Sequence, residues 1–211
     1  MSDGSVQSDA YQGQADVTDP THPYNALTFA INQVLNGKWT VTIGQVKAVN
    51  GGGTGGPPTV NVQPMVHMID GYGKPTPHGI INNLLAFRLQ GGTGGIVCDP
   101  VVGDIGLLAF ASRDISTAVA NKAPAVPGSR RTFDPADGIF FGGLLGAALT
   151  QFINFTSTGI AIQDKNGNVI TTGSSGIAIT VVGDFTVNGI SVLSHTHAVT
   201  TAPGETGPPV R

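Results

Sequence analysis

Two histidines near the C-terminus are the residues best suited to binding a metal ion. They stand two apart in the segment Ser194-His195-Thr196-His197. On a β-strand, side chains two apart point to the same side, so His195 and His197 can offer two imidazoles to one ion. Two ligands are too few for a stable site. The pair therefore needs ligands from elsewhere, or it consists of two solvated surface histidines.

No set of residues with the pattern of a catalytic site stands out. The sequence has no GxSxG or HExxH motif and no glycine-rich loop that ends in Lys-Ser or Lys-Thr. Asp99, Asp104 and Asp114 lie in turn-like sequence, where aspartate is favoured for backbone reasons rather than for acid–base chemistry. We therefore expect a protein without enzymatic activity.

The composition favours strands and turns over long helices. Only 11% of the 211 residues are charged, against about 25% in an ordinary soluble domain, and the chain has 31 glycines and 14 prolines. A net charge of −3 gives no reason to expect a nucleic-acid partner. The N-terminus lacks the pattern of a signal peptide, so we expect synthesis in the cytoplasm. The single cysteine, Cys98, excludes an intrachain disulfide framework, and we expect its thiol to be buried.

The first part of the chain predicts a short helix followed by a β-barrel. Residues 1–37 form an N-terminal arm, with apolar side chains at helical spacing over 22–35. From Lys38 the apolar period changes to two, and about five short strands with turn punctuation follow. We expect a small closed barrel over 38–120, of the OB type first and of the SH3-like type as the alternative. Residues 121–138 are expected to be a solvated linker that carries Arg130 and Arg131.

The C-terminal part contains a repeated β-pattern with very little charge. The sequence Thr-Gly-Ile-Ala-Ile at 158–162 recurs as Ser-Gly-Ile-Ala-Ile at 175–179, with a weaker third copy at 189–192. Between the first two copies, 165–168 predicts a type I′ turn. A single chain with strands this short would leave edges and an apolar face exposed.

Three copies around one axis would cover those edges and faces, so we expect a homotrimer. A monomeric β-domain with a sticky face is the alternative. In a trimer, His195 and His197 of three chains supply six nitrogens in an octahedral arrangement. Such ligation suits iron or nickel better than zinc, which prefers four ligands in structural sites.

The order of these motifs resembles the central spike proteins of contractile-tailed phages and R-type pyocins. The resemblance covers about 38–211 and rests on the barrel segment 100–115, the glycine-punctuated repeats, and the H-x-H followed by APGETGPPV. It implies an all-β protein: an OB-fold-like barrel over 38–120, a trimeric intertwined β-helix needle over 139–193 and a metal-binding apex over 194–211. It further implies one iron ion per trimer, held by His195 and His197 of each chain.

The same resemblance implies a function in host entry. Such a spike is attached to the baseplate hub through its N-terminal region, lies at the tip of the virion tail, and pierces the host outer membrane when the sheath contracts. It has no enzymatic activity of its own. A trimeric receptor-binding tail fibre and a cell-wall-degrading tail enzyme are the alternatives.

Overall fold

The computed structural model describes residues 22–69 and 74–196 and is mostly β-structure with few helices. The chain divides into two compact units between Gly146 and Ala147, and each is described by itself. None of the described helices has the length and apolar character needed to cross a membrane.

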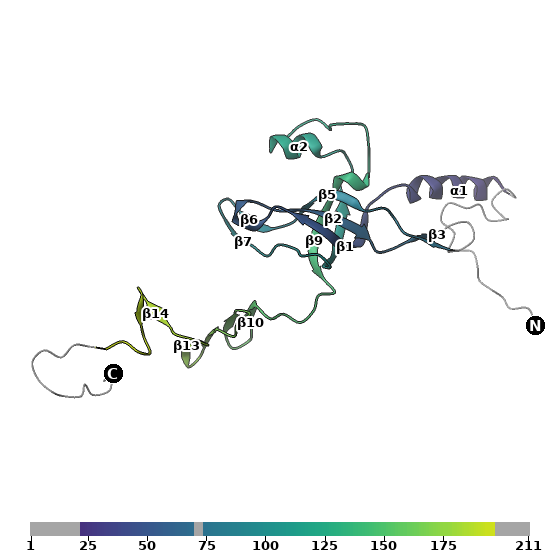
Figure 1. Ribbon diagram of the computed structural model, residues 1–211. Helices are drawn as coiled ribbons and strands as arrows, with labels where there is room; N and C mark the ends of the chain where they lie inside the picture. Colours follow the sequence, from purple (N-terminus) through teal and green to yellow (C-terminus); the bar gives the residue numbers. More distant parts are fainter. Residues whose placement is uncertain (1–21, 70–73, 197–211) are drawn as a thin grey trace, which may run out of the picture. The chain divides into compact units, whose positions relative to one another are not determined.

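The first unit contains a closed five-stranded barrel (Figure 1). Its strands are β1 (Val41–Asn50), β2 (Thr59–Pro64), β5 (Ile81–Ala86), β8 (Ile105–Phe110) and β9 (Gly138–Leu144). They follow the order β1-β2-β5-β9-β8, and β8 pairs with β1 to close the ring. All pairs are antiparallel except β5 and β9, which run parallel. The expected barrel is thus present.

The barrel core follows directly from the alternation seen in the sequence. Every second residue of β2 and β8 is buried, and these residues meet those of the other strands inside the ring. The buried apolar side chains are Val46, Val60, Val62, Leu84, Ala86, Leu108, Phe110 and Phe140. Gly44 and Gly106 face each other on β1 and β8. A Cβ at Gly106 would lie 2.5 Å from the Phe140 ring, so this position has no room for a side chain.

The barrel extends further along the chain than the expected range 38–120. Its fifth strand, β9, follows the segment 121–138 that we expected to be a linker, and it occupies the start of the range assigned to the needle. The barrel needs this fifth strand because β5 and β8 do not pair with each other. Phe140 of β9 fills the core between them, in register with Ala86 and Leu108. The segment 121–138 is therefore a connection within the barrel, not a linker between domains.

Helices and small hairpins accompany the barrel. Helix α1 (Pro23–Asn36) agrees with the expected helix at 22–35, and α2 (Ser116–Asn121) and the short 3₁₀ helix η3 (Pro135–Asp137) lie between β8 and β9. A further 3₁₀ turn, η2 (Gly53–Gly55), lies between β1 and β2. Two small hairpins pair β3 (Met68–Ile69) with β4 (Pro75–Thr76), and β6 (Leu89–Gly91) with β7 (Gly94–Ile96). Cys98 is exposed, so its expected burial was wrong.

The second unit is a four-stranded antiparallel sheet followed by a two-stranded one. The larger sheet joins β10 (Phe152–Phe155), β11 (Ile160–Gln163), β12 (Val169–Gly173) and β13 (Gly176–Thr180) in chain order. The smaller one pairs β14 (Thr186–Val187) with β15 (Ile190–Ser191). The three sequence repeats coincide with β11, β13 and β15, so the repeats fall on every second strand.

The connection between β11 and β12 differs from the expected type I′ turn. A type I′ turn needs positive φ at both central residues, but among residues 165–168 only Gly167 has it. The Asp164 carboxylate instead accepts hydrogen bonds from the backbone N–H groups of Asn166 and Asn168. An aspartate that binds the backbone ahead of it makes its own turn, and this gives a wider loop.

Candidate functional site

One face of the four-stranded sheet carries a continuous row of isoleucines. Ile153, Ile162, Ile170 and Ile179 are cross-strand partners on four successive strands. They are 55%, 43%, 41% and 49% exposed, respectively. Directly opposed β-branched side chains of this kind pack against each other, so the row forms one apolar ridge across the sheet.

A second row, which is apolar except for Thr172, lies beside the first on the same face. Residues two apart on a strand share a face, which places Phe155, Ile160 and Ile177 next to the isoleucine row. Phe155 and Ile177 are 76% and 73% exposed. We call these seven side chains the isoleucine face: Ile153, Phe155, Ile160, Ile162, Ile170, Ile177 and Ile179.

The other face of the sheet has a different character. It carries Asn154, Gln163, Thr171 and Thr180 among small or apolar residues, and Phe152 and Val169 on it are half-buried. In the described part of this unit, the large apolar side chains are therefore concentrated on the more exposed face of the sheet. Burying the exposed remainder of one such isoleucine contributes about 1 kcal/mol. The six isoleucines and Phe155 together contribute several times that amount per chain.

The two histidines expected to bind metal lie at the edge of the described part of the chain. His195 is exposed and follows a turn after β15, so residues 192–196 do not form the strand that we expected. Ser191 holds this turn: its Oγ accepts a hydrogen bond from the Ser194 N–H at 2.8 Å and donates to Asp184. His197 lies outside the described residues. Within 22–69 and 74–196, no three histidine, cysteine or acidic side chains come together to form a metal site.

A buried ionic cluster closes the long connection between β8 and β9. Arg131 donates from Nη2 to Asp114 Oδ1 at 2.9 Å, and from Nε to Asp137 Oδ2 at 2.7 Å. The side chains of Asp114 and Asp137 are only 2% and 1% exposed. Arg131 is therefore not the solvated linker residue that the sequence indicated, and neither aspartate is a free acid.

Hydrogen bonds keep both aspartates of this cluster ionised. Those from Ser116, followed by that from Ser129 and the charge of Arg131, lower the pKa of Asp114 to about 2. The hydrogen bond from Arg131 is the main reason why the pKa of Asp137 is lowered, against the effect of burial, which raises it. The same bond raises the pKa of Arg131. These shifts describe a structural clamp rather than an acid–base pair.

A second ion pair holds the glycine-rich turn after β1. Arg88 is almost fully buried and donates to Asp99 Oδ1 at 2.6 Å. The other oxygen of Asp99 accepts the backbone N–H of Gly53 at 2.5 Å, and these bonds lower the pKa of Asp99. Asp104 accepts the N–H of Val101 within its own turn. The turn role expected for Asp104 is confirmed, whereas the pairing of Asp99 with Arg88 was missed.

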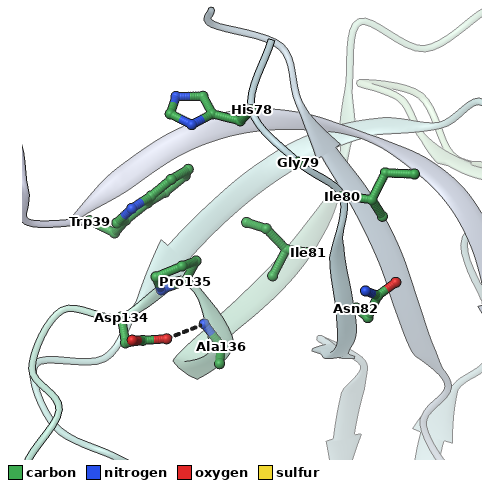
Figure 2. A pocket seen from close by; sticks show the side chains of 9 residues that line it. All are labelled: Trp39, His78, Gly79, Ile80, Ile81, Asn82, Asp134, Pro135 and Ala136. Atoms are coloured by element: carbon green, nitrogen blue, oxygen red, sulfur yellow. Dashed lines mark hydrogen bonds between the residues drawn. The ribbon is translucent and has the colours of Figure 1, made fainter. Parts of the chain in front are cut away.

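The barrel also carries an open hollow of about 340 Å³. Figure 2 shows Trp39, Ile81 and Pro135 around it, and Ile80 and Asn82 also line it. His78 contacts Trp39 edge to face, with ring centroids 4.7 Å apart. Burial, and secondarily the charge of His67, lowers the pKa of His78. The rings of His78 and Trp39 together give this part of the hollow an aromatic wall.

No protein-family model matches the chain, and no curated protein matches it either. The functional argument therefore depends on the residues described above. Among the described features, the isoleucine face is the one that exposes seven large apolar side chains on one side of a sheet.

Proposed function

We propose that the chain is a homotrimer in which three copies of the C-terminal unit turn their isoleucine faces toward a common axis. The observation that carries this proposal is the exposure of the isoleucine face, with 41% of Ile170 and 73% of Ile177 open to solvent. Three copies fit because each sheet also has two outer strands, β10 and β13, that can pair with neighbouring chains. This arrangement covers the open strand edges and the exposed apolar face, both of which otherwise favour aggregation.

We further propose that this trimer is the needle of a non-enzymatic central spike, which pierces the host outer membrane when a contractile tail contracts. The low charge of the needle supports this use. Between 147 and 196 the only charged side chains are Asp164, Lys165 and Asp184. Each charged side chain at the centre of a bilayer costs about 3 kcal/mol on insertion scales. Few charges therefore lower the barrier to pushing the needle through a membrane.

The barrel is the proposed attachment to the baseplate hub. A five-stranded Greek-key ring whose third and fifth strands run parallel fits an OB-type barrel better than an SH3-like one. The hollow lined by Trp39 and His78 supplies an open, largely apolar surface on this barrel. An apolar side chain of the hub would fit there, because aromatic residues are favoured at protein interfaces.

His195 and His197 are the proposed ligands of one iron ion per trimer. Imidazole nitrogen suits iron. One chain supplies only two of the six ligands of an octahedral site, so three chains are needed to complete it. His195 is exposed and follows the turn that Ser191 holds. An ion bound there would cross-link three chain ends at the tip, where folds usually open first.

The experiment that tests this function locates the chain in assembled particles. Gold-labelled antibody against the barrel is applied to tail particles from cells that produce the protein, and electron micrographs record the label. We expect the label at the distal centre of the baseplate. Label on peripheral fibres, or glycan binding by the purified protein, would instead support a receptor-binding fibre. Clearing of a cell-wall suspension would support an enzyme.

A further inference from the structure

Helix α1 presents an apolar seam that is exposed in the described part of the chain. Tyr24, Leu27, Ile31 and Val34 follow one another at spacings of three, four and three residues along α1. They are 71%, 60%, 49% and 64% exposed. This spacing is the a–d–a–d pattern of two coiled-coil heptads. Leu35, 59% exposed, flanks the seam at its C-terminal end.

The side of α1 opposite the seam is less exposed. Asn25, Phe29 and Gln33 stand four residues apart and are half-buried, whereas none of the helix residues is fully buried. At 100° per residue, these three positions lie roughly opposite the seam. Among the described residues of α1, the more apolar side is thus also the more exposed one.

The helix needs a partner for its stability. It has 14 residues, and isolated helices shorter than about 12–15 residues are marginal in water. Its N-cap is the His22 side chain, which accepts the N–H of Tyr24 at 3.2 Å. The range 22–37 contains no aspartate, glutamate, lysine or arginine, so no ion pair along the helix adds support. Most of the stabilising free energy must therefore come from packing of the seam.

We infer that the α1 helices of three chains pack through this seam as a short parallel coiled coil. The inference rests on the proposed trimer. The partner is other copies of this chain because α1 ends only a few residues before the barrel, where Lys38 binds Thr132 and the Trp39 N–H binds Phe133. In the proposed trimer the three helices belong to one particle, which gives them a high effective concentration, and its three-fold symmetry gives them the same direction. With no charged side chain in 22–37, nothing in the helices repels the copies.

Disulfide trapping in the full chain tests this arrangement. In a Cys98→Ser background, which removes the exposed native thiol, Ile31→Cys places a thiol on the seam and Asn32→Cys places one on the next, solvent-facing position. Thiols can join only where their Cα atoms approach within about 7 Å. Under mild oxidation we expect about tenfold more covalent two-chain product from Ile31→Cys than from the matched Asn32→Cys control.

The outcomes separate this inference from the trimer on which it rests. A trimeric mass with equal trapping, or with no trapping, at both positions overturns the coiled coil and leaves the proposed function standing. A monomeric mass overturns both. Amide exchange in the unmodified protein is the second measurement, should a cysteine variant fail to fold. We expect protected amides over 23–36, and loss of protection in that range alone after Leu27→Ser. Unprotected exchange of α1 in the unmodified trimer would refute the inference.

Discussion

Replacing one residue of the isoleucine row tests whether that row is buried between chains. Ile162 lies between Ile153 and Ile170 and is 43% exposed in a single chain. If it stays exposed, Ile162→Ala costs about 1 kcal/mol, the transfer free energy of a half-buried side chain. If it is buried at a three-fold axis, the same change costs about 3 kcal/mol per chain, or about 9 kcal/mol per trimer, because a cavity is left in every copy.

Resistance to SDS is a suitable assay, because an intertwined trimer unfolds slowly. The fraction of protein that migrates as trimer is followed with time at several temperatures. We expect the unmodified protein to persist at room temperature and Ile162→Ala to lose its trimer band much sooner. Thr171→Ala is the matched control, since Thr171 lies on the opposite face of the neighbouring strand, between Ala161 and Ala178. Equal, small effects of the two substitutions would refute the burial of the isoleucine face.

The remaining predictions concern the ionic cluster and the metal. Arg131→Gln should speed amide exchange between β8 and β9, because it leaves two buried carboxylates without their cation. Arg130→Gln is the control and should not change the exchange. Equal exchange in both variants would show that the clamp is unimportant. The pKa of Asp114 is lowered to about 2, so its contribution to stability should be complete above a pH of about 4 and be lost as the pH falls toward 2. Melting temperatures recorded over this acidic pH range measure that loss. Elemental analysis should find one iron per trimer, lost at acidic pH as imidazoles protonate, and none after His195→Ala with His197→Ala; full iron in that double variant would refute the site.

The barrel could be predicted in outline because its signal is local. Val60 and Val62 on β2, and Leu108 and Phe110 on β8, alternate with more exposed residues as a half-buried strand requires. The last strand could not be placed in this way. Phe140 lies in a run of apolar residues and glycines that resembles the later repeats, and its burial depends on a gap between two strands far away in sequence.

The ionic cluster was missed for a related reason. Arg131 stands in a Pro- and Ala-rich segment that reads as solvated, and its partners are 17 and 6 residues away along the chain. A single arginine between two turn aspartates is a weak signal until the fold brings the three together. The expected metal site likewise depends on residues far from the pair, because His195 and His197 need ligands from other chains.

The molar mass of the purified full-length protein tests the central claim most directly. Light scattering at micromolar concentration measures it without a label or a variant. The trimer predicts three times the chain mass of 21.5 kDa, and the value should not change on dilution. A clean 21.5 kDa monomer would contradict the buried isoleucine face, the six-histidine site and the packing of α1 together.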